Sequence, residues 1–130
     1  MRAARPRDPA YFRQALRLLA RMHHRGVAHN DLARELNWLV TPRGEPAVID
    51  FQLAWCDAAR GRLFRVMARE DLRHLLKHKR YYCPQELTAR QLRILAQPGV
   101  ASRLWRRTLN PAGRRLRRWL APKHQPSGNQ

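Results

Sequence analysis

The stretch that decides the fold runs from His24 to Trp55 and reads HRGVAHNDLARELNWLVTPRGEPAVIDFQLAW. Residues 38–40 and 47–49 within it are two short apolar runs on either side of the turn sequence TPRGE. Apolar runs of strand length around a turn that contains Pro and Gly are typical of a β-hairpin. We therefore predict a hairpin here, with the residues just before its first strand and just after its second brought close together.

Polar side chains lie at both ends of the predicted hairpin. Asn37 comes directly before the first strand, Asp50 directly after the second, and Asp31 lies on the loop that enters the hairpin. We expect two carboxylates and an amide to converge at this point. Their oxygen atoms are suitable ligands for Mg²⁺ on a nucleotide phosphate, and a carboxylate can orient an attacking hydroxyl group. The stretch therefore predicts a site for phosphoryl transfer.

This stretch resembles the catalytic and metal-binding loops of the protein-kinase-like superfamily, in the order His29-x-Asp31, Asn37 and Asp50-Phe51. It looks closest to bacterial RIO-type and other atypical serine/threonine kinases, and more distantly to aminoglycoside and choline phosphotransferases. The resemblance implies a phosphotransferase that uses ATP and Mg²⁺. Asp31 would orient or deprotonate the acceptor hydroxyl, and Asn37 and Asp50 would bind the metal and with it the nucleotide. His29 would brace the loop against the turn after the hairpin.

Several positions near this motif either extend the resemblance or depart from it. Arg34 is a candidate for the cation that family members place near the transferred phosphate, two or three residues after the catalytic Asp. Asn30 replaces the Arg of H-R-D, and Gln52 replaces the Gly of D-F-G. Asn37 lies one residue further from Asp31 than the family spacing, which predicts a one-residue bulge in the loop.

The fold class implied is α+β, mostly helical, similar to a kinase C-terminal lobe with one β-hairpin. Helical periodicity predicts a first helix over 9–24, with Asp8 as N-cap and Pro9 at its first position. A second helix is predicted over 60–79, with a possible break at Glu70-Asp71, and Tyr81 and Tyr82 are expected to anchor a loop. The sequence Thr88-x-x-Gln91 is a capping box that opens a helix to residue 96. Further short helices are expected over 101–109 and 111–120, between a disordered segment 1–8 and a flexible tail 121–130.

The predicted domain, residues 9–120, corresponds to the C-terminal kinase lobe alone. No glycine-rich loop and no strand with a phosphate-binding Lys precede the first helix, and a kinase needs both for its nucleotide. We therefore expect a truncated or degenerate kinase relative that is weakly active or inactive by itself. The acceptor remains open between a protein hydroxyl, a lipopolysaccharide sugar and another small molecule.

Charge supports a second hypothesis from a different class. The chain carries 27 Lys and Arg against 9 Asp and Glu, a net charge of +18, and its last acidic residue is Glu86. The segment Arg103–Lys123 is strongly basic, which is typical of binding to phosphate groups, nucleic acid or an anionic membrane. A non-catalytic basic module for RNA or an anionic membrane is therefore the alternative, against the simpler interpretation of a solvated Arg-rich surface.

The remaining sequence features point to a cytoplasmic chain. It has no run of eighteen apolar residues and no apolar core of a secretory signal, so neither a transmembrane segment nor export is expected. Cys56 and Cys83 have no metal-ligand spacing and are interpreted as two reduced thiols. His23 and His24 are interpreted as histidines at the end of the first helix.

Overall fold

The computed structural model describes residue 6 and residues 8–99. The predictions for residues 101–130, including the segment Arg103–Lys123, lie outside these residues, as does most of segment 1–8. The described part is an α+β fold, in agreement with the predicted class. Its elements along the chain are α1 (Pro9–His24), β1 (Val27–Ala28), the 3₁₀ helix η1 (Glu35–Asn37), β2 (Trp38–Val40), β3 (Pro46–Val48), β4 (Trp55–Cys56), α2 (Arg62–Tyr82), the 3₁₀ helix η2 (Pro84–Glu86) and α3 (Ala89–Ala96).

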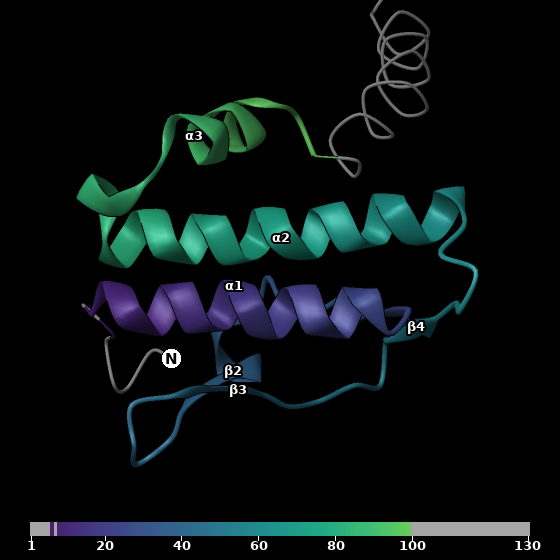
Figure 1. Ribbon diagram of the computed structural model, residues 1–130, viewed down its shortest axis with the longest axis horizontal. Helices are drawn as coiled ribbons and strands as arrows, with labels where there is room; N and C mark the ends of the chain where they lie inside the picture. The colour runs from purple at the N-terminus through teal and green to yellow at the C-terminus, as the bar shows by residue number, and fades with distance from the viewer. Residues whose placement is uncertain (1–5, 7, 100–130) are drawn as a thin grey trace, which may run out of the picture. The chain divides into compact units, whose positions relative to one another are not determined.

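Helix α1 forms as its sequence predicts. The Asp8 carboxylate accepts a hydrogen bond of 2.7 Å from the backbone N–H of Ala10, and Pro9 takes the first helical position, where a missing N–H costs nothing. The buried residues of α1 recur at helical spacing: Tyr11, Phe12, Ala15 and Leu19. This face lies against α2, and the two helices run side by side (Figure 1).

Helix α2 is longer than predicted and has no break at Glu70-Asp71. No Gly or Pro interrupts the sequence between Arg62 and Tyr82, and the Asp71 side chain, which could compete for backbone hydrogen bonds, is engaged by other partners. The predicted loop around Tyr81 and Tyr82 is therefore wrong, because both tyrosines belong to the last turn of α2. Tyr82 packs partly on the core, whereas Tyr81 is exposed.

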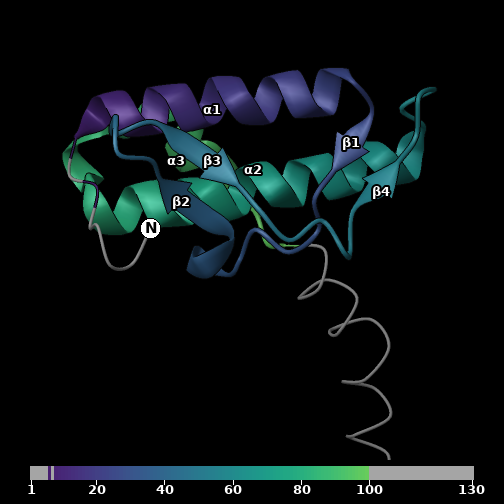
Figure 2. The same ribbon diagram turned by 90° about the horizontal axis from the view of Figure 1, so that it is seen from below.

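The predicted hairpin is present as the antiparallel pair β2–β3, with Trp38 opposite Val48 and Val40 opposite Pro46. Its second strand begins and ends one residue earlier than expected, because Pro46 is accommodated on this edge strand. A second antiparallel pair, β1–β4, was not predicted, and it joins Val27 to Cys56. Figure 2 shows the hairpin in front of the helices and the β1–β4 pair near the end of α1.

The core is shared by both long helices and the hairpin. Its buried members are Tyr11, Phe12, Ala15, Leu19, Leu32, Trp38, Leu75 and Cys83. The expectation that Leu32 points into the core is confirmed. Burial raises the pKa of the Tyr11 hydroxyl well above its usual range, so it remains protonated and donates a hydrogen bond of 3.0 Å to the Leu39 carbonyl of the hairpin.

Helix α3 packs on α2 and begins with the predicted capping box. The Thr88 side chain accepts from the Gln91 backbone N–H, and the Gln91 side chain accepts from the Thr88 backbone N–H. The same Gln91 oxygen accepts a hydrogen bond of 3.0 Å from the buried Lys79 ammonium of α2, which joins the two helices. Among the described residues, no helix has the length and apolar character that crossing a membrane requires.

Candidate functional site

The 29–37 loop, from His29 to Asn37, carries four of the five predicted site residues and is held by its own side chains. The Asn37 amide nitrogen donates two hydrogen bonds of 2.9 Å, one to the backbone carbonyl of Asp31 and one to its carboxylate Oδ2. Asn37 is buried and belongs to the 3₁₀ helix η1, and a backbone bond from Arg34 to the Asp31 carbonyl tightens the turn before it. The extra residue between Asp31 and Asn37 is thus taken up in tight turns.

The hairpin returns the chain to this loop at Ile49. The Ile49 backbone N–H donates to the Asn37 carbonyl at 3.1 Å, and the Ile49 carbonyl lies 2.9 Å from Nε2 of the His29 ring. Both backbone polar groups of the residue before Asp50 are therefore bonded to predicted site residues. The His29 ring also contacts the Phe51 ring, with centroids 4.8 Å apart.

The hydrogen bonds of His29 define its tautomer. The Asp31 backbone N–H points at Nδ1 at 3.3 Å, so Nδ1 is the acceptor and the proton is on Nε2. That proton is then available for the Ile49 carbonyl, so a single tautomer satisfies both contacts. His29 is completely buried and connects the backbone of Asp31 with that of Ile49. The structure therefore places His29 where the sequence expected a brace.

Asn30 and Asp50 both have a backbone φ of 66°, in the left-handed region that most residues avoid. Asn and Asp tolerate this conformation better than other residues with a side chain. The Asn30 amide also donates a hydrogen bond of 3.0 Å to the Leu53 carbonyl, a second link between the 29–37 loop and the segment after Asp50. Asn30, which replaces the Arg of the family motif, thus has a role that the sequence did not reveal.

A buried carboxylate on α2, that of Asp71, binds the backbone at the beginning of the 29–37 loop. Asp71 Oδ2 accepts from the His29 backbone N–H at 2.6 Å and lies 3.2 Å from His23 Nε2, and Oδ1 accepts from the Asn30 backbone N–H at 2.9 Å. Its side chain is 1% exposed. Asp71 was not predicted as part of the site. The available signal was its position on the apolar stripe of α2, in helical phase with Phe64 and Leu75, where a carboxylate needs a partner.

His78 supports the next part of the loop from the same face of α2. Its Nε2 lies 2.9 Å from the Leu32 carbonyl, and its Nδ1 lies 3.7 Å from the Glu35 carboxylate. The Tyr82 hydroxyl is 3.3 Å from both Glu35 carboxylate oxygens. The 29–37 loop therefore rests on three polar side chains of one helix, which fixes the position of Asp31 without a regular secondary structure.

The structure brings the Arg34 guanidinium to Asp31, whereas Asp50 is joined to this loop through the backbone of Ile49. The Arg34 guanidinium is 3.6 Å from Asp31 Oδ2 and is largely exposed, so the pair adds little stability while keeping a cation beside the carboxylate. Within the described residues, no hydrogen bond or ion pair is recorded for the exposed Asp50 side chain. Asp50 follows the bonded Ile49 directly, so its backbone is positioned while its carboxylate is open to solvent.

The oxygen atoms at this site suit a hard cation. The hydrogen bonds of the Asn37 side chain to Asp31 use its nitrogen, which leaves its amide oxygen as a ligand atom, and Asp50 supplies carboxylate oxygens directly after Ile49, whose backbone N–H donates to the Asn37 carbonyl. Two protein ligands fit Mg²⁺, which keeps several waters and takes phosphate oxygens. No group of three or more His, Cys, Asp or Glu side chains that could hold a metal occurs among the described residues.

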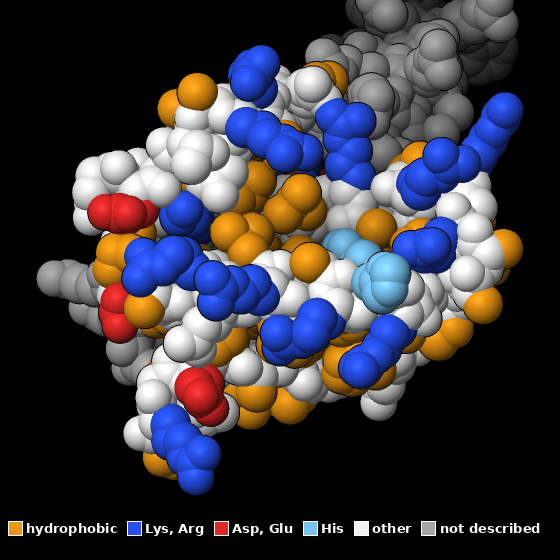
Figure 3. Space-filling view, viewed as in Figure 1, with side chains coloured by type: hydrophobic (Ala, Val, Ile, Leu, Met, Phe, Trp, Pro, Cys, Tyr) orange, Lys and Arg blue, Asp and Glu red, His pale blue; other side chains and the backbone are white. Residues whose placement is uncertain are grey.

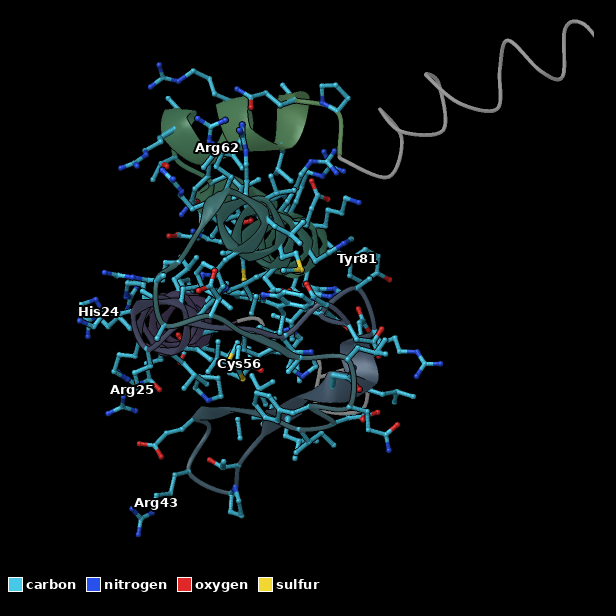
Figure 4. The ribbon with its side chains drawn as sticks, turned by 90° about the vertical axis from the view of Figure 1, so that its right-hand side faces the viewer. His24, Arg25, Arg43, Cys56, Arg62 and Tyr81 are labelled. Carbon is cyan, nitrogen blue, oxygen red and sulfur yellow. The ribbon has the colours of Figure 1, made fainter. Side chains whose placement is uncertain are left out.

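Three exposed apolar side chains lie on the hairpin and on the segment that follows it. Leu39, Ile49 and Phe51 are between 40% and 46% exposed, and Leu39 lies on the face of the hairpin opposite the buried Trp38. Figure 4 shows the hairpin turn with Arg43 projecting away from the rest of the described fold.

Comparison of the chain with protein-family models, with curated proteins and with solved structures gives no significant match in any of the three.

Proposed function

We propose that the chain is a relative of RIO-like serine/threonine kinases that binds ATP and Mg²⁺ and is weakly active or inactive as a phosphotransferase by itself. The observation that carries this proposal is the attachment of Ile49 to His29 and Asn37 through both of its backbone polar groups. This attachment fixes Asp50 relative to the loop that carries Asp31. Phosphoryl transfer requires one carboxylate that binds the metal and another that orients the hydroxyl. The two must be held in fixed relative positions, since positioning supplies most of the rate.

Asp31 is suited to orient an acceptor hydroxyl. Its Oδ2 is held by the Asn37 amide and lies near the Arg34 guanidinium, so Oδ1 is the oxygen left to accept a hydroxyl proton. The side chain is about one-fifth exposed, which keeps it within reach of a substrate. A positioned carboxylate of this kind orients the attacking group and takes up its proton as the bond to phosphorus forms. Arg34 would face the negative charge of the transferred group.

Asn37 and Asp50 would hold Mg²⁺, which would draw charge from the nucleotide phosphates. The exposed Leu39, Ile49 and Phe51 offer an apolar surface on which a nucleobase can lie. A site that consumes ATP implies a cytoplasmic location. The acceptor is a hydroxyl compound, and it remains open between a protein, a lipopolysaccharide sugar and another small molecule.

Binding of Mn²⁺ with ATP, followed by water proton relaxation, tests the proposal without requiring turnover. We expect Asp50→Asn to weaken the binding of the Mn²⁺–ATP complex about tenfold, equivalent to about 1.4 kcal/mol. The control is Glu45→Gln in the hairpin turn, which removes one negative charge from an exposed carboxylate elsewhere. Equal affinities of wild type and Asp50→Asn would contradict the proposal, as would equal losses in both variants.

A further inference from the structure

A pocket of about 580 Å³ lies between the end of α1 and the beginning of α2. It is lined by Ala20, His23, His24, Ala59, Arg60, Phe64 and Arg65. None of these residues belongs to the predicted phosphotransfer site. The volume lies in the range of pockets that hold small organic ligands.

The lining of this pocket combines cationic and apolar side chains. Two Arg and two His side chains contribute to it, and none of its lining residues is acidic. The carboxylates of Asp57 and Asp71 are engaged within the protein, since Asp57 accepts from the Ala59 and Gly61 backbone N–H groups and Asp71 holds the 29–37 loop. Figure 3 shows His side chains on this side of the described fold, bordered by Lys and Arg side chains.

Arg60 is held in a conformation that arginine avoids. Its φ is 51°, and the other described residues with a side chain and a positive φ are Asn30 and Asp50 of the candidate site. A left-handed arginine is strained, and Asn or Gly in its place would reduce the strain. The conformation brings the Arg60 guanidinium to 3.5 Å from His24 Nδ1, so that the Arg60 and His24 side chains meet at the rim of the pocket. Figure 4, which faces this end of α1, shows His24 projecting outward.

We propose that this pocket is a second ligand site, which binds a small phosphomonoester. The phosphate would lie against the guanidinium groups of Arg60 and Arg65 and the His24 ring, because guanidinium forks match phosphate oxygens in geometry and charge. The organic part would lie against Ala20, Ala59 and the small exposed part of the Phe64 side chain. This inference does not depend on phosphotransfer at Asp31.

The pocket is connected to the 29–37 loop through two side chains. His23 forms part of its wall, and His23 Nε2 lies 3.2 Å from Asp71 Oδ2. Asp71 in turn accepts from the backbone N–H groups of His29 and Asn30. A ligand beside His23 therefore changes the surroundings of the carboxylate that holds the loop, and binding is expected to alter the amide resonances of His29 and Asn30.

Titration of the ¹⁵N-labelled protein with phenyl phosphate and with inorganic phosphate, at constant ionic strength, tests the site. We expect saturable one-to-one binding, with phenyl phosphate the tighter ligand because of the apolar wall. The variant Arg60→Gln/Arg65→Gln should bind phenyl phosphate at least about tenfold more weakly. The matched control Arg13→Gln/Arg80→Gln removes two exposed charges, one on α1 and one on α2, that do not line the pocket. It should change the affinity less than about twofold.

A further variant, Arg60→Asn, separates binding from folding. Asn tolerates the left-handed backbone, so the variant should unfold at a temperature no lower than wild type while it loses affinity for phenyl phosphate. Equal losses of affinity in the pocket and control variants would overturn the proposal, because they would show general attraction to a basic protein. Binding of RNA without saturable binding of phenyl phosphate would also overturn it. Unchanged His29 and Asn30 resonances in the saturated protein would overturn the link to the loop.

Discussion

Asp71 and His29 are 42 positions apart in the sequence, and the backbone N–H of His29 donates a hydrogen bond of 2.6 Å to Asp71 Oδ2. The second carboxylate oxygen takes the backbone N–H of Asn30, so one buried side chain satisfies two successive loop amides. Asn30 is left-handed at this point, and a strained backbone persists only where its surroundings hold it. Asp71 is therefore the residue that sets the shape of the loop before Asp31.

The first prediction concerns Asp71→Asn. An amide has one acceptor oxygen where the carboxylate has two, and its NH₂ group would face a backbone donor or His23. Because hydrogen bonds to a buried charged group contribute about 1.5–3 kcal/mol each and are not additive, we expect a loss of about 3 kcal/mol in the free energy of unfolding. Urea denaturation measures this loss, with Glu45→Gln as a surface control expected to change stability by less than about 0.5 kcal/mol.

Hydrogen exchange adds a local test of the same variant. The His29 and Asn30 amides should exchange faster relative to the amides of α1 and α2, because their acceptor is lost. Uniform acceleration across the chain, with no excess at these two residues, would show that Asp71 acts on global stability alone and would contradict the role proposed for it.

The second prediction separates the shape of His29 from its hydrogen bonds. His29→Phe keeps an aromatic ring beside Phe51 but takes this hydrogen-bond partner from the part-buried Ile49 carbonyl and Asp31 N–H, at a cost of about 1–3 kcal/mol. His29→Gln carries an NH₂ group that can donate to the Ile49 carbonyl, so it should recover part of the loss. The measurements are the free energy of unfolding and the affinity for Mn²⁺ with ATP. If Phe were tolerated as well as Gln, the bond to Ile49 would have no energetic role.

Local pattern was sufficient to predict much of this fold. The hairpin, α1 with its Asp8 cap and the capping box of α3 were all readable, because each depends on residues within a few positions of one another. Asn37 and Asp50 were expected to meet for the same reason, since a hairpin joins its own ends, and Asp31 was expected nearby on the loop that enters the hairpin. Asp50 was placed beside them only through the backbone of Ile49, and the position of its side chain could not be derived from the pattern.

The contacts that the sequence did not reveal are long-range. Asp71 and His29 are 42 positions apart in the sequence. Strands β1 and β4 are also far apart, and no turn sequence joins them directly, so their pairing could not be predicted from a local pattern. Asp71 was instead interpreted, together with Glu70, as a break between two helices. A carboxylate in the apolar phase of α2 is the feature that distinguishes a buried ligand of backbone amides from a helix end.

The third prediction concerns the two thiols. Cys56 is exposed, whereas Cys83 is completely buried, and burial raises the pKa of the Cys83 thiol. A raised pKa means that less thiolate is present at a given pH, and the thiolate is the reactive form. At pH 8 we expect iodoacetamide to modify Cys56 first and Cys83 only slowly in the folded protein, with both thiols reacting at similar rates in urea. Peptide mass spectrometry distinguishes the sites, and faster labelling of Cys83 in the folded protein would contradict its burial.

The last prediction compares two glycines with nearly the same backbone conformation. Gly26 has φ 76° and Gly44 has φ 77°, so alanine at either position bears the cost of a left-handed residue, about 1–2 kcal/mol. Their surroundings differ. A Cβ on Gly44, in the hairpin turn, would meet nothing within 4 Å. A Cβ on Gly26 would collide with the backbone carbonyl of Asp57, the residue whose N–H donates to the Gly26 carbonyl at 2.8 Å.

Gly26→Ala should therefore destabilise the protein by about 2 kcal/mol more than Gly44→Ala, because backbone atoms must move apart to admit the methyl group. The displaced Asp57 lies directly after β4, so the β1–β4 pair and the pocket at the end of α1 should loosen with it. Urea unfolding measures the difference in stability between the two variants. The cost of a left-handed alanine is the same in both, so it cancels in this difference. Equal stabilities of the two variants would mean that the backbone at Asp57 moves away from residue 26 at no cost in stability. The close contact between Gly26 and Asp57 would then not stabilise the fold.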